Sequence, residues 1–334
     1  MLLNYLRTAL RNIRRHRVHS LLNIAGLSIG MACAIIILQW VRLEFNYDRY
    51  HTNADRIYRL ATDFNFGNFQ ARAATSAHPV GPTLQRDFDE VEKAVRFRGS
   101  WGNSIVTTGD RAFAENRMYF ADHTVFEIFS FTLIHGDPGT ALAAPYKIVL
   151  TRDAALKYFG TIDVVGKPMQ INNPRFAALQ HGPQVTVTGV MENVPPNSHL
   201  RFSMLLSFET YYQGNEAQRQ RWTGDIDNYT YLLLAPNGDV EALVKKFPNF
   251  VQAHLEQSVK EAGAGYDLFL QPLTRIHLHS NLAGDTSDRY HFYKVIALLV
   301  TAVLILMIAS INFINLSNPR LAGRAKEVGI RKAL

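Results

Sequence analysis

Two segments near the ends of the chain are long and apolar enough to cross a lipid bilayer. They are LLNIAGLSIGMACAIIILQWV (residues 21–41) and VIALLVTAVLILMIASINFINL (residues 295–316), and neither contains a charged side chain. A span needs about 20 residues at a rise of about 1.5 Å each, whereas a cleaved signal peptide has an apolar region of only about 7–15 residues. We therefore predict two transmembrane helices, at residues 21–41 and 292–317.

Basic residues are concentrated at both ends of the chain. Residues 1–20 contain five arginines and no acidic residue, and residues 292–334 contain six basic residues and one acidic residue. Residues 42–291 contain 24 basic and 27 acidic residues, so the net charge of +7 does not come from the middle. Because basic residues flank the cytoplasmic ends of membrane spans, we predict that both termini are cytoplasmic and residues 42–291 are outside. A nucleic-acid-binding domain would carry its charge on a folded face, so nucleic acid is not an expected partner.

The N-terminal region and the first span each show a helical pattern. In residues 1–20, apolar side chains recur on one helix face and arginines on another. This pattern predicts a cytoplasmic basic amphipathic helix lying against membrane lipids, with a solvated tail as the alternative. In the first span, Gly26, Gly30 and Ala34 are spaced at four residues. Such a ridge of small residues allows another helix to approach closely, although the same spacing also arises by chance.

The middle of the chain, residues 42–291, reads as a mixture of short strands and helices without a regular strand–helix–strand rhythm. This favours an α+β domain. The only cysteine, Cys33, lies in the first span, so the external domain has no disulfide and depends on packing. Expected strands cover residues 56–66, 91–98, 111–120, from 147, 184–190, 201–208, 228–235 and 266–273. Expected helices cover residues 82–90, 124–131, 151–160 and 239–258.

No catalytic or cofactor-binding motif is apparent. The chain has no GxxxxGK[ST] or GxGxxG phosphate loop and no GxSxG nucleophile elbow. His277 and His279 would share one face of a strand and offer two metal ligands, but a third ligand cannot be identified, and a structural role is favoured. The acidic residues between Asp87 and Glu92 fit a solvated face. We therefore expect no catalytic residues, no metal and no cofactor, and any ATP would be hydrolysed by another chain.

The C-terminal segment RAKEVGIRKAL (residues 324–334) has the periodicity of a short, basic, amphipathic helix. Pro319 precedes it and is expected to set it off from the second span. Such a helix could lie on the membrane or insert into a groove of a soluble partner. The residues alone do not choose between these two roles.

Six stretches spread over the whole chain resemble one family. The sequence looks like the first half of a MacB/FtsX-type ABC transporter permease of the kind abundant in Bacteroidetes. The matching stretches are NIRRHRVHSLLNIAGLSIGMACAIIIL (12–38), FNYDRYHTNADRIYRL (45–60), IVLTRDAALKYFG (148–160), VTGVMENVPPNSHLRFSMLLS (185–207), LQPLTRIHLHS (270–280) and INFINLSNPRLAGRAKEVGIRKAL (311–334).

This resemblance implies a multi-pass protein of the bacterial inner membrane. Residues 42–291 would form a MacB-like periplasmic core domain with a porter-like lobe and an inserted lobe, and residues 318–334 would begin with a coupling helix. A separate cytoplasmic ABC ATPase dimer would bind ATP and drive export, efflux or lipoprotein-type transport by mechanotransmission. The residues that match the family's ATPase contact are Arg324, Lys326, Glu327, Val328, Ile330, Arg331 and Lys332.

The resemblance also implies further partners. These are a second permease half or a homodimer partner, membrane lipids and, in some family members, a periplasmic adaptor with an outer-membrane channel. The family pattern continues past the GIRK motif with further transmembrane helices, so we expect the chain to be a fragment or a truncated product. The alternative is a two-span membrane sensor with a periplasmic ligand-binding domain. The cargo cannot be read from the sequence.

Overall fold

The computed structural model describes residues 17–66, 69–100, 102–254, 264–285 and 292–333, with side chains of the last helix described as far as Ile314. The chain divides into two compact units. One contains the long helices α2 (Arg17–Phe45) and α10 (Phe292–Ala333). The other is an α+β unit formed by residues 46–289. The expected helix within residues 1–20 lies largely outside the described residues.

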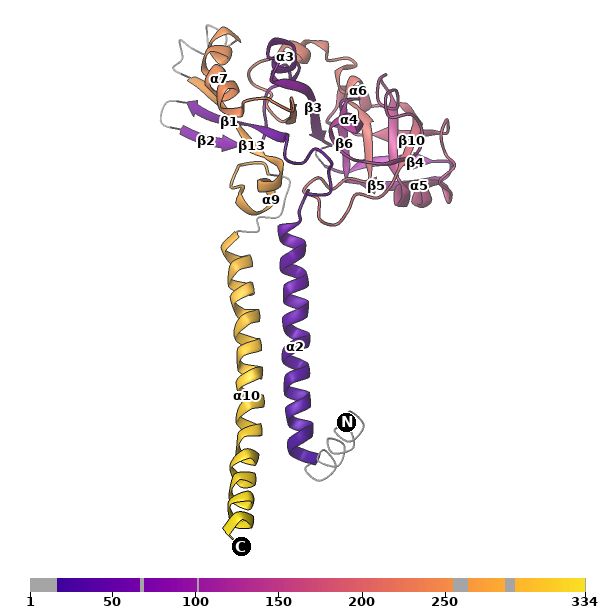
Figure 1. The fold of residues 1–334 in the computed structure, drawn as a ribbon. Helices are drawn as coiled ribbons and strands as arrows, with labels where there is room; N and C mark the ends of the chain where they lie inside the picture. The colour runs from indigo at the N-terminus through magenta and orange to yellow at the C-terminus, as the bar shows by residue number, and fades with distance from the viewer. Residues whose placement is uncertain (1–16, 67–68, 101, 255–263, 286–291, 334) are drawn as a thin grey trace. The chain divides into compact units, whose positions relative to one another are not determined.

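The two long helices lie side by side and antiparallel (Figure 1). Their apolar stretches, Ser20–Phe45 and Phe292–Ile314, have mean hydropathies of 2.4 and 2.7, and only 17% of each is buried. Large side chains such as Ile36 and Ile308 are each 66% exposed. A core helix of a soluble protein would bury such residues, whereas an apolar surface on all sides suits a lipid environment. Both expected apolar segments therefore form helices suited to a membrane.

Pro319, which was expected to prevent the second span from continuing unbent, lies within α10, which runs as one helix to Ala333. Proline removes one backbone hydrogen bond and crowds the carbonyl four residues earlier, which bends a helix without requiring it to end. The segment expected to form a separate coupling helix is therefore the last part of α10. Its side chains lie outside the described residues.

The α+β unit is built on one mixed sheet. Its described strands are hydrogen-bonded in the order β13-β1-β12-β3-β6-β11-β8-β10-β9-β4-β5, with β2 beside β1 and β7 beside β10. The pairs β6–β11 and β8–β10 are parallel, and the other pairs are antiparallel. The strand bounds are β1 Ile57–Phe66, β2 Phe69–Ala73, β3 Val91–Gly99, β4 Ser104–Thr108, β5 Arg111–Glu115, β6 Met118–Ala121, β7 Leu133–His135, β8 Lys147–Thr151, β9 Pro168–Asn172, β10 Gln184–Met191, β11 Met204–Ser207, β12 Tyr229–Leu234 and β13 Ala264–Pro272.

The strand order shows where one part of the domain is inserted into another. Strands β4 to β11, which are continuous in sequence, form one end of the sheet, and β1, β3, β12 and β13 form the other end. In Figure 1, β4, β5 and β10 accordingly lie away from β1, β2 and β13. The stretch from β4 to β11 thus lies between β3 and β12 in the sequence and forms one end of the same sheet.

Short helices cover the sheet at both ends. Helices α3 and α7 pack with β1, β12 and β13, and α5 and α6 pack with β8, β10 and β11. The helix bounds are α3 Val80–Asp87, α4 Val125–Ile128, α5 Arg152–Phe159, α6 Phe208–Tyr212, α7 Val240–His254 and α9 Ile276–His279, with 3₁₀ turns η1 Ala177–Leu179, η2 Glu216–Gln220 and η3 Leu273–Arg275.

The β8–α5 unit has the local structure that its sequence predicts. Thr151 ends the strand in an extended conformation, and its side chain accepts a hydrogen bond from the amide of Ala154. Gly160 ends the helix with a φ of 74°, a left-handed conformation that costs glycine little. Both the helix cap and the helix stop are therefore confirmed.

Three local predictions are wrong. Residues 111–120 form two strands, because β5 pairs with β4 whereas β6 pairs with β3 and β11. The strand expected at 201–208 begins only at Met204, and Ser207 then caps α6. The segment with His277 and His279 is the helical turn α9. Residues two apart in a helix point about 200° apart, so these histidines do not share a face.

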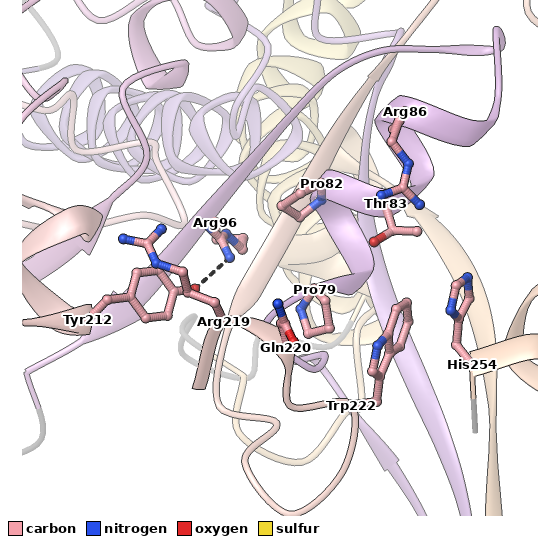
Figure 2. A pocket seen from close by; sticks show the side chains of 10 residues that line it. All are labelled: Pro79, Pro82, Thr83, Arg86, Arg96, Tyr212, Arg219, Gln220, Trp222 and His254. Carbon is pink, nitrogen blue, oxygen red and sulfur yellow. Dashed lines mark hydrogen bonds between the residues drawn. The ribbon is translucent and has the colours of Figure 1, made fainter. Parts of the chain in front are cut away.

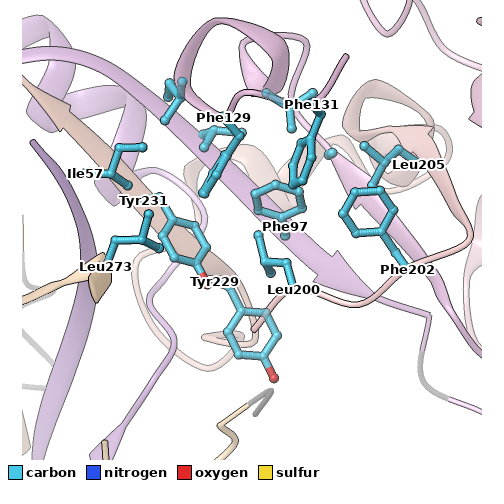
Figure 3. Close-up of a cluster of buried hydrophobic side chains, with 14 of the residues drawn as sticks. Ile57, Phe97, Phe129, Phe131, Leu200, Phe202, Leu205, Tyr229, Tyr231 and Leu273 are labelled. Carbon is cyan, nitrogen blue, oxygen red and sulfur yellow. The ribbon is translucent and has the colours of Figure 1, made fainter. Parts of the chain in front are cut away.

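The centre of the sheet has a hydrophobic core on each face. Tyr231 and Leu233 of β12 face the aromatic core around Phe97 and Phe129 (Figure 3). Leu232 and Leu234 alternate with them and face α3 and α7. Because both faces are covered, every residue of β12 is buried.

Candidate functional site

The first segment of the α+β unit, directly after the last residue of α2, carries a buried carboxylate. Asp48 is fully buried and has a φ of 57°, which is uncommon for a residue other than glycine. Its amide donates to the carbonyl of Asn197 at 2.9 Å. Its Oδ1 accepts hydrogen bonds from the Ser198 hydroxyl at 3.2 Å and from the His199 amide at 3.0 Å. Asp48 therefore joins this segment to the turn between β10 and β11.

The imidazole of His199 continues the contact into the sheet. Its Nδ1 lies 2.9 Å from Oδ2 of Asp48, and its Nε2 lies 2.6 Å from the hydroxyl of Tyr231 on β12. Burial alone would raise the pKa of Asp48, but the charge of His199 and its hydrogen bonds lower that pKa overall. Burial raises the pKa of Tyr231 far above its usual value, so its phenol stays protonated.

A second ion pair lies beside Tyr231. Arg59 of β1 is the cross-strand partner of Tyr231 and is fully buried. Its Nη1 donates to Oδ1 of Asp285 at 2.9 Å, and its Nη2 donates to Gln271 at 2.6 Å and to Ser280 at 2.9 Å. Burial would raise the pKa of Asp285, but the hydrogen bond and the charge of Arg59 lower it overall. We call Asp48, His199, Tyr231, Arg59 and Asp285 the polar network.

The last segment of the unit contacts the first segment directly. The ring of His277 on α9 stacks on that of Tyr47 with centroids 3.4 Å apart and an interplanar angle of 3°. The Tyr47 hydroxyl also accepts a hydrogen bond from Arg201 at 2.7 Å. Backbone hydrogen bonds between Ala283 and the end of β2 add to this attachment. The two ends of the unit are therefore held to each other and to the central strands.

The network has the composition of a catalytic triad without its arrangement. In a Ser–His–Asp triad the imidazole contacts the hydroxyl, whereas Ser198 donates to Asp48 and accepts from Tyr50. Asp48, Ser198 and His199 are at most 2% exposed, so a substrate cannot reach them. The arrangement can hold elements together, and it does not activate the hydroxyl for chemistry.

A neighbouring histidine is held neutral by its surroundings. His51 is 3% exposed and packs edge-on against Phe129 and Phe131. Burial lowers the pKa of His51 to about 4. Its Nδ1 accepts a hydrogen bond from the amide of Ser130 at 3.0 Å, an interaction that requires this nitrogen to be unprotonated.

The ridge of small residues predicted in the first span faces α10 of the same chain. A Cβ added at Gly30 would come within 2.7 Å of the Cβ of Ala309, and one at Gly26 within 3.3 Å of Nδ2 of Asn312. Ala34 is 1% exposed. The small residues thus allow close packing of the two helices within the chain.

Two other groups of residues from the sequence analysis do not form a site among the described side chains. The side chains of the seven predicted ATPase-contact residues, between Arg324 and Lys332, are outside the described residues. The acidic cluster is divided among separate partners, since Asp87 pairs with Arg86, Glu90 with Lys246 and Glu92 with Arg56. Within the described residues, no group of three or more His, Cys, Asp and Glu side chains is arranged to hold a metal ion.

The sequence patterns did not predict the polar network, although three of its five residues lie in stretches quoted for the family resemblance. Asp48 and Arg59 lie in FNYDRYHTNADRIYRL and His199 lies in PPNSHLR, whereas Tyr231 and Asp285 lie outside these stretches. Gln271 and Ser280, which accept hydrogen bonds from Arg59, lie in LQPLTRIHLHS. The available signal was Arg59, a charged residue between Tyr58 and Leu60 in a stretch expected to form a strand. Their partners are up to 226 residues apart, so no local pattern connects them.

Comparison with known proteins agrees with this architecture. The family model of the MacB-like periplasmic core domain matches residues 20–250. A solved domain from Porphyromonas gingivalis, assigned to a permease protein, is 20% identical with a TM-score of 0.57 and covers 74% of this chain and 98% of its own. No curated protein matches the chain.

Two further solved structures resemble the chain more distantly. The periplasmic region of MacB from Actinobacillus actinomycetemcomitans is 13% identical, with a TM-score of 0.45, and covers 67% of this chain and 91% of its own. The extracellular domain of the noncanonic ABC-type transporter YknZ from Gram-positive bacteria is 13% identical, with a TM-score of 0.40, and covers 59% of this chain and 90% of its own.

An α+β domain attached to two apolar helices defines a membrane protein with a large extramembrane domain. The family model covers more than half of the chain. The chain therefore belongs to the MacB-like periplasmic core domain family of ABC transporter permeases.

The central position of Tyr231 predicts a large effect of removing its hydroxyl. In Tyr231→Phe, the buried ring nitrogen of His199 loses its partner, so we expect a loss of about 1–3 kcal/mol in the free energy of unfolding. The matched control is Tyr266→Phe, because the buried Tyr266 hydroxyl has no hydrogen-bond partner among the described residues. Urea unfolding followed by near-ultraviolet circular dichroism measures both variants. Equal stability of the two variants would contradict the role of Tyr231.

The environment of His51 predicts a loss of stability at mildly acidic pH. Its pKa is about 4 in the folded protein and about 6.5 in the unfolded chain. Between these pH values the unfolded chain binds more protons at this histidine than the folded protein does. The free energy of unfolding therefore falls as the pH drops from about 6.5 to about 4, by up to about 3 kcal/mol. His51→Asn, which keeps an acceptor near Nδ1, should flatten this dependence of the melting temperature on pH. The control His123→Asn, at an exposed position, should retain the pH dependence of the wild-type protein. If the melting temperature of His51→Asn varies with pH as steeply as that of the wild-type protein, His51 is not the cause.

Proposed function

We propose that this chain is a permease subunit of a MacB/FtsX-type ABC transporter and transmits motion from a cytoplasmic ATPase to its α+β domain. The observation that carries the proposal is the polar network. It joins the segment that continues from α2 to the segment that leads toward α10, and both to the central strands β1 and β12. A displacement of either helix end is thereby passed to the sheet.

The chemistry of the network suits such a mechanical role. Asp48 and Arg59 are charged groups at 0% exposure. Separating a buried charge from its partner costs about 3–5 kcal/mol, because the remaining charge is left uncompensated. A moderate displacement is therefore more easily accommodated by moving the sheet as a body than by pulling its ends apart.

The proposal includes an orientation and partners. Both termini lie in the cytoplasm, where basic residues flank membrane spans, and the α+β domain lies in the periplasm. ATP is bound and hydrolysed by a cytoplasmic ABC ATPase dimer, so this chain is not itself an enzyme and takes no cofactor. A second permease half or a second copy completes the membrane assembly, and the function is export, efflux or lipoprotein-type transport.

The proposed contact with the ATPase is the last part of α10. In the sequence, Glu327 and Arg331 are spaced four residues apart and fall on one helix face. Together with Arg324, Lys326, Val328, Ile330 and Lys332 they offer both charges and apolar groups to a groove of the partner.

Co-purification with the cognate ATPase tests the assignment. We expect the double variant Glu327→Ala/Arg331→Ala to lose at least about tenfold in affinity for the ATPase, the equivalent of about 1.4 kcal/mol. The control Arg320→Ala removes a basic residue of the same segment outside the proposed contact and should bind as the unmodified chain does. If the double variant associates as strongly as this control, the proposed contact is wrong.

A further inference from the structure

A cavity of about 580 Å³ opens in the α+β unit between residues that are far apart in the sequence. It is lined by Pro79, Pro82, Thr83 and Arg86 at α3, Arg96 of β3, Tyr212 of α6, Arg219 and Gln220 of η2, Trp222 and His254. Figure 2 shows these side chains grouped around the opening. The volume is in the range of sites that hold small organic ligands, about 300–1,000 Å³.

The wall of this cavity carries positive groups and no carboxylate. Arg86, Arg96 and Arg219 line it, and the carboxylates that pair with them are absent from the lining. Arg96 is fixed behind the wall, because it is bonded to Asp122 and donates to the Tyr212 hydroxyl at 2.8 Å.

The other two arginines are more accessible to a ligand. Arg86 is paired with Asp87 through Nε and Nη2, which leaves Nη1 outside this pair, and its side chain is 69% exposed. Arg219 is paired with Glu209 and Glu216, and its side chain is 39% exposed. The exposed Arg86–Asp87 pair contributes little stability, so an arriving anion can share the Arg86 guanidinium at small cost. Arg219 donates through Nε to Glu216 and through Nη1 and Nη2 to Glu209, and each of these two Nη atoms keeps a second N–H for an anion.

An aromatic surface faces the same cavity. The ring of Trp222 stacks on that of His254 with centroids 4.1 Å apart and an interplanar angle of 5°. Phe250 packs edge-on against Trp222 at 5.8 Å. These neighbours hold the indole in a fixed orientation at the wall. A flat, rigid aromatic wall favours a ligand with a ring of its own.

We propose that this cavity binds a small aromatic anion, with its ring against Trp222 and its acidic group at Arg86 and Arg219. An inorganic anion would not use the aromatic wall, and a cation would find no carboxylate among the lining residues. The site goes beyond the proposed function, because neither the membrane helices nor the polar network contributes a residue to it. It gives the α+β domain a way to recognise an organic acid directly.

Fluorescence of Trp222 provides the test. The chain has three tryptophans, so Trp40→Phe/Trp101→Phe leaves Trp222 as the only reporter in the full chain, placed in phosphatidylcholine nanodiscs. Benzenesulfonate serves as the probe, benzenesulfonamide as its uncharged counterpart and methanesulfonate as the anion without a ring. We expect saturable quenching by benzenesulfonate and at least about tenfold weaker binding of the other two compounds.

Arginine variants of the Trp40→Phe/Trp101→Phe chain show whether benzenesulfonate binds in this cavity. Arg86→Gln and Arg219→Gln should each weaken binding of benzenesulfonate by about tenfold, the typical effect of losing one charge-assisted hydrogen bond. Arg152→Gln removes an arginine of another exposed ion pair, with Glu192 after β10, and should leave binding unchanged. The proposal is overturned if benzenesulfonate causes no saturable quenching, or if benzenesulfonamide or methanesulfonate binds equally well. It is also overturned if both cavity variants bind benzenesulfonate as tightly as Arg152→Gln does. Circular dichroism checks that all variants are folded.

Discussion

The architecture of the α+β unit depends on the buried carboxylate of Asp48. This residue adopts a left-handed backbone conformation, which turns the chain directly after α2 and brings the carboxylate inside. There the carboxylate pairs with Nδ1 of His199, and Nε2 of His199 is hydrogen-bonded to the hydroxyl of Tyr231 in the middle of the sheet. A buried charge is tolerated only when it is paired and hydrogen-bonded. The chain leaving the helix must therefore take one route into the domain, and the same route leads through Arg59 to the segment before the second helix.

This arrangement also explains how the domain can contain a large insertion without losing contact between its ends. The strands of residues 104–207 extend the sheet at one side, whereas β1, β12 and β13 keep the first and last segments together at the other. Arg59 and Tyr231 of the polar network lie on this second group of strands, and His199 reaches Tyr231 from the segment between β10 and β11. The cavity near Trp222 lies on α3, β3 and the region after α6, where its ligand would not disturb the network.

Local features of the fold could be predicted from the sequence, and long-range features could not. Thr151 and Gly160 determine their helix ends through neighbours at most four residues away, and the two apolar spans follow from length and composition. The α9 turn was misread because the alternation of its histidines with apolar residues resembles a strand. The network was missed since its contacts join residues such as Arg59 and Asp285, which only the folded sheet brings together. The family resemblance covered the stretches that contain Asp48, Arg59 and His199, without showing their contacts.

Native-state hydrogen exchange tests the central claim that both ends of the domain belong to one cooperative unit with the central strands. The amide of Asp48 is bonded to Asn197, and that of Ala283 to Arg72. The account predicts that these two amides open with the same free energy as that of Leu232 in β12, because the network unfolds only with the sheet. Exchange of Asp48 and Ala283 about a hundredfold faster than Leu232, a difference of about 2.7 kcal/mol in opening free energy, would show that the ends are loosely attached and would contradict the account.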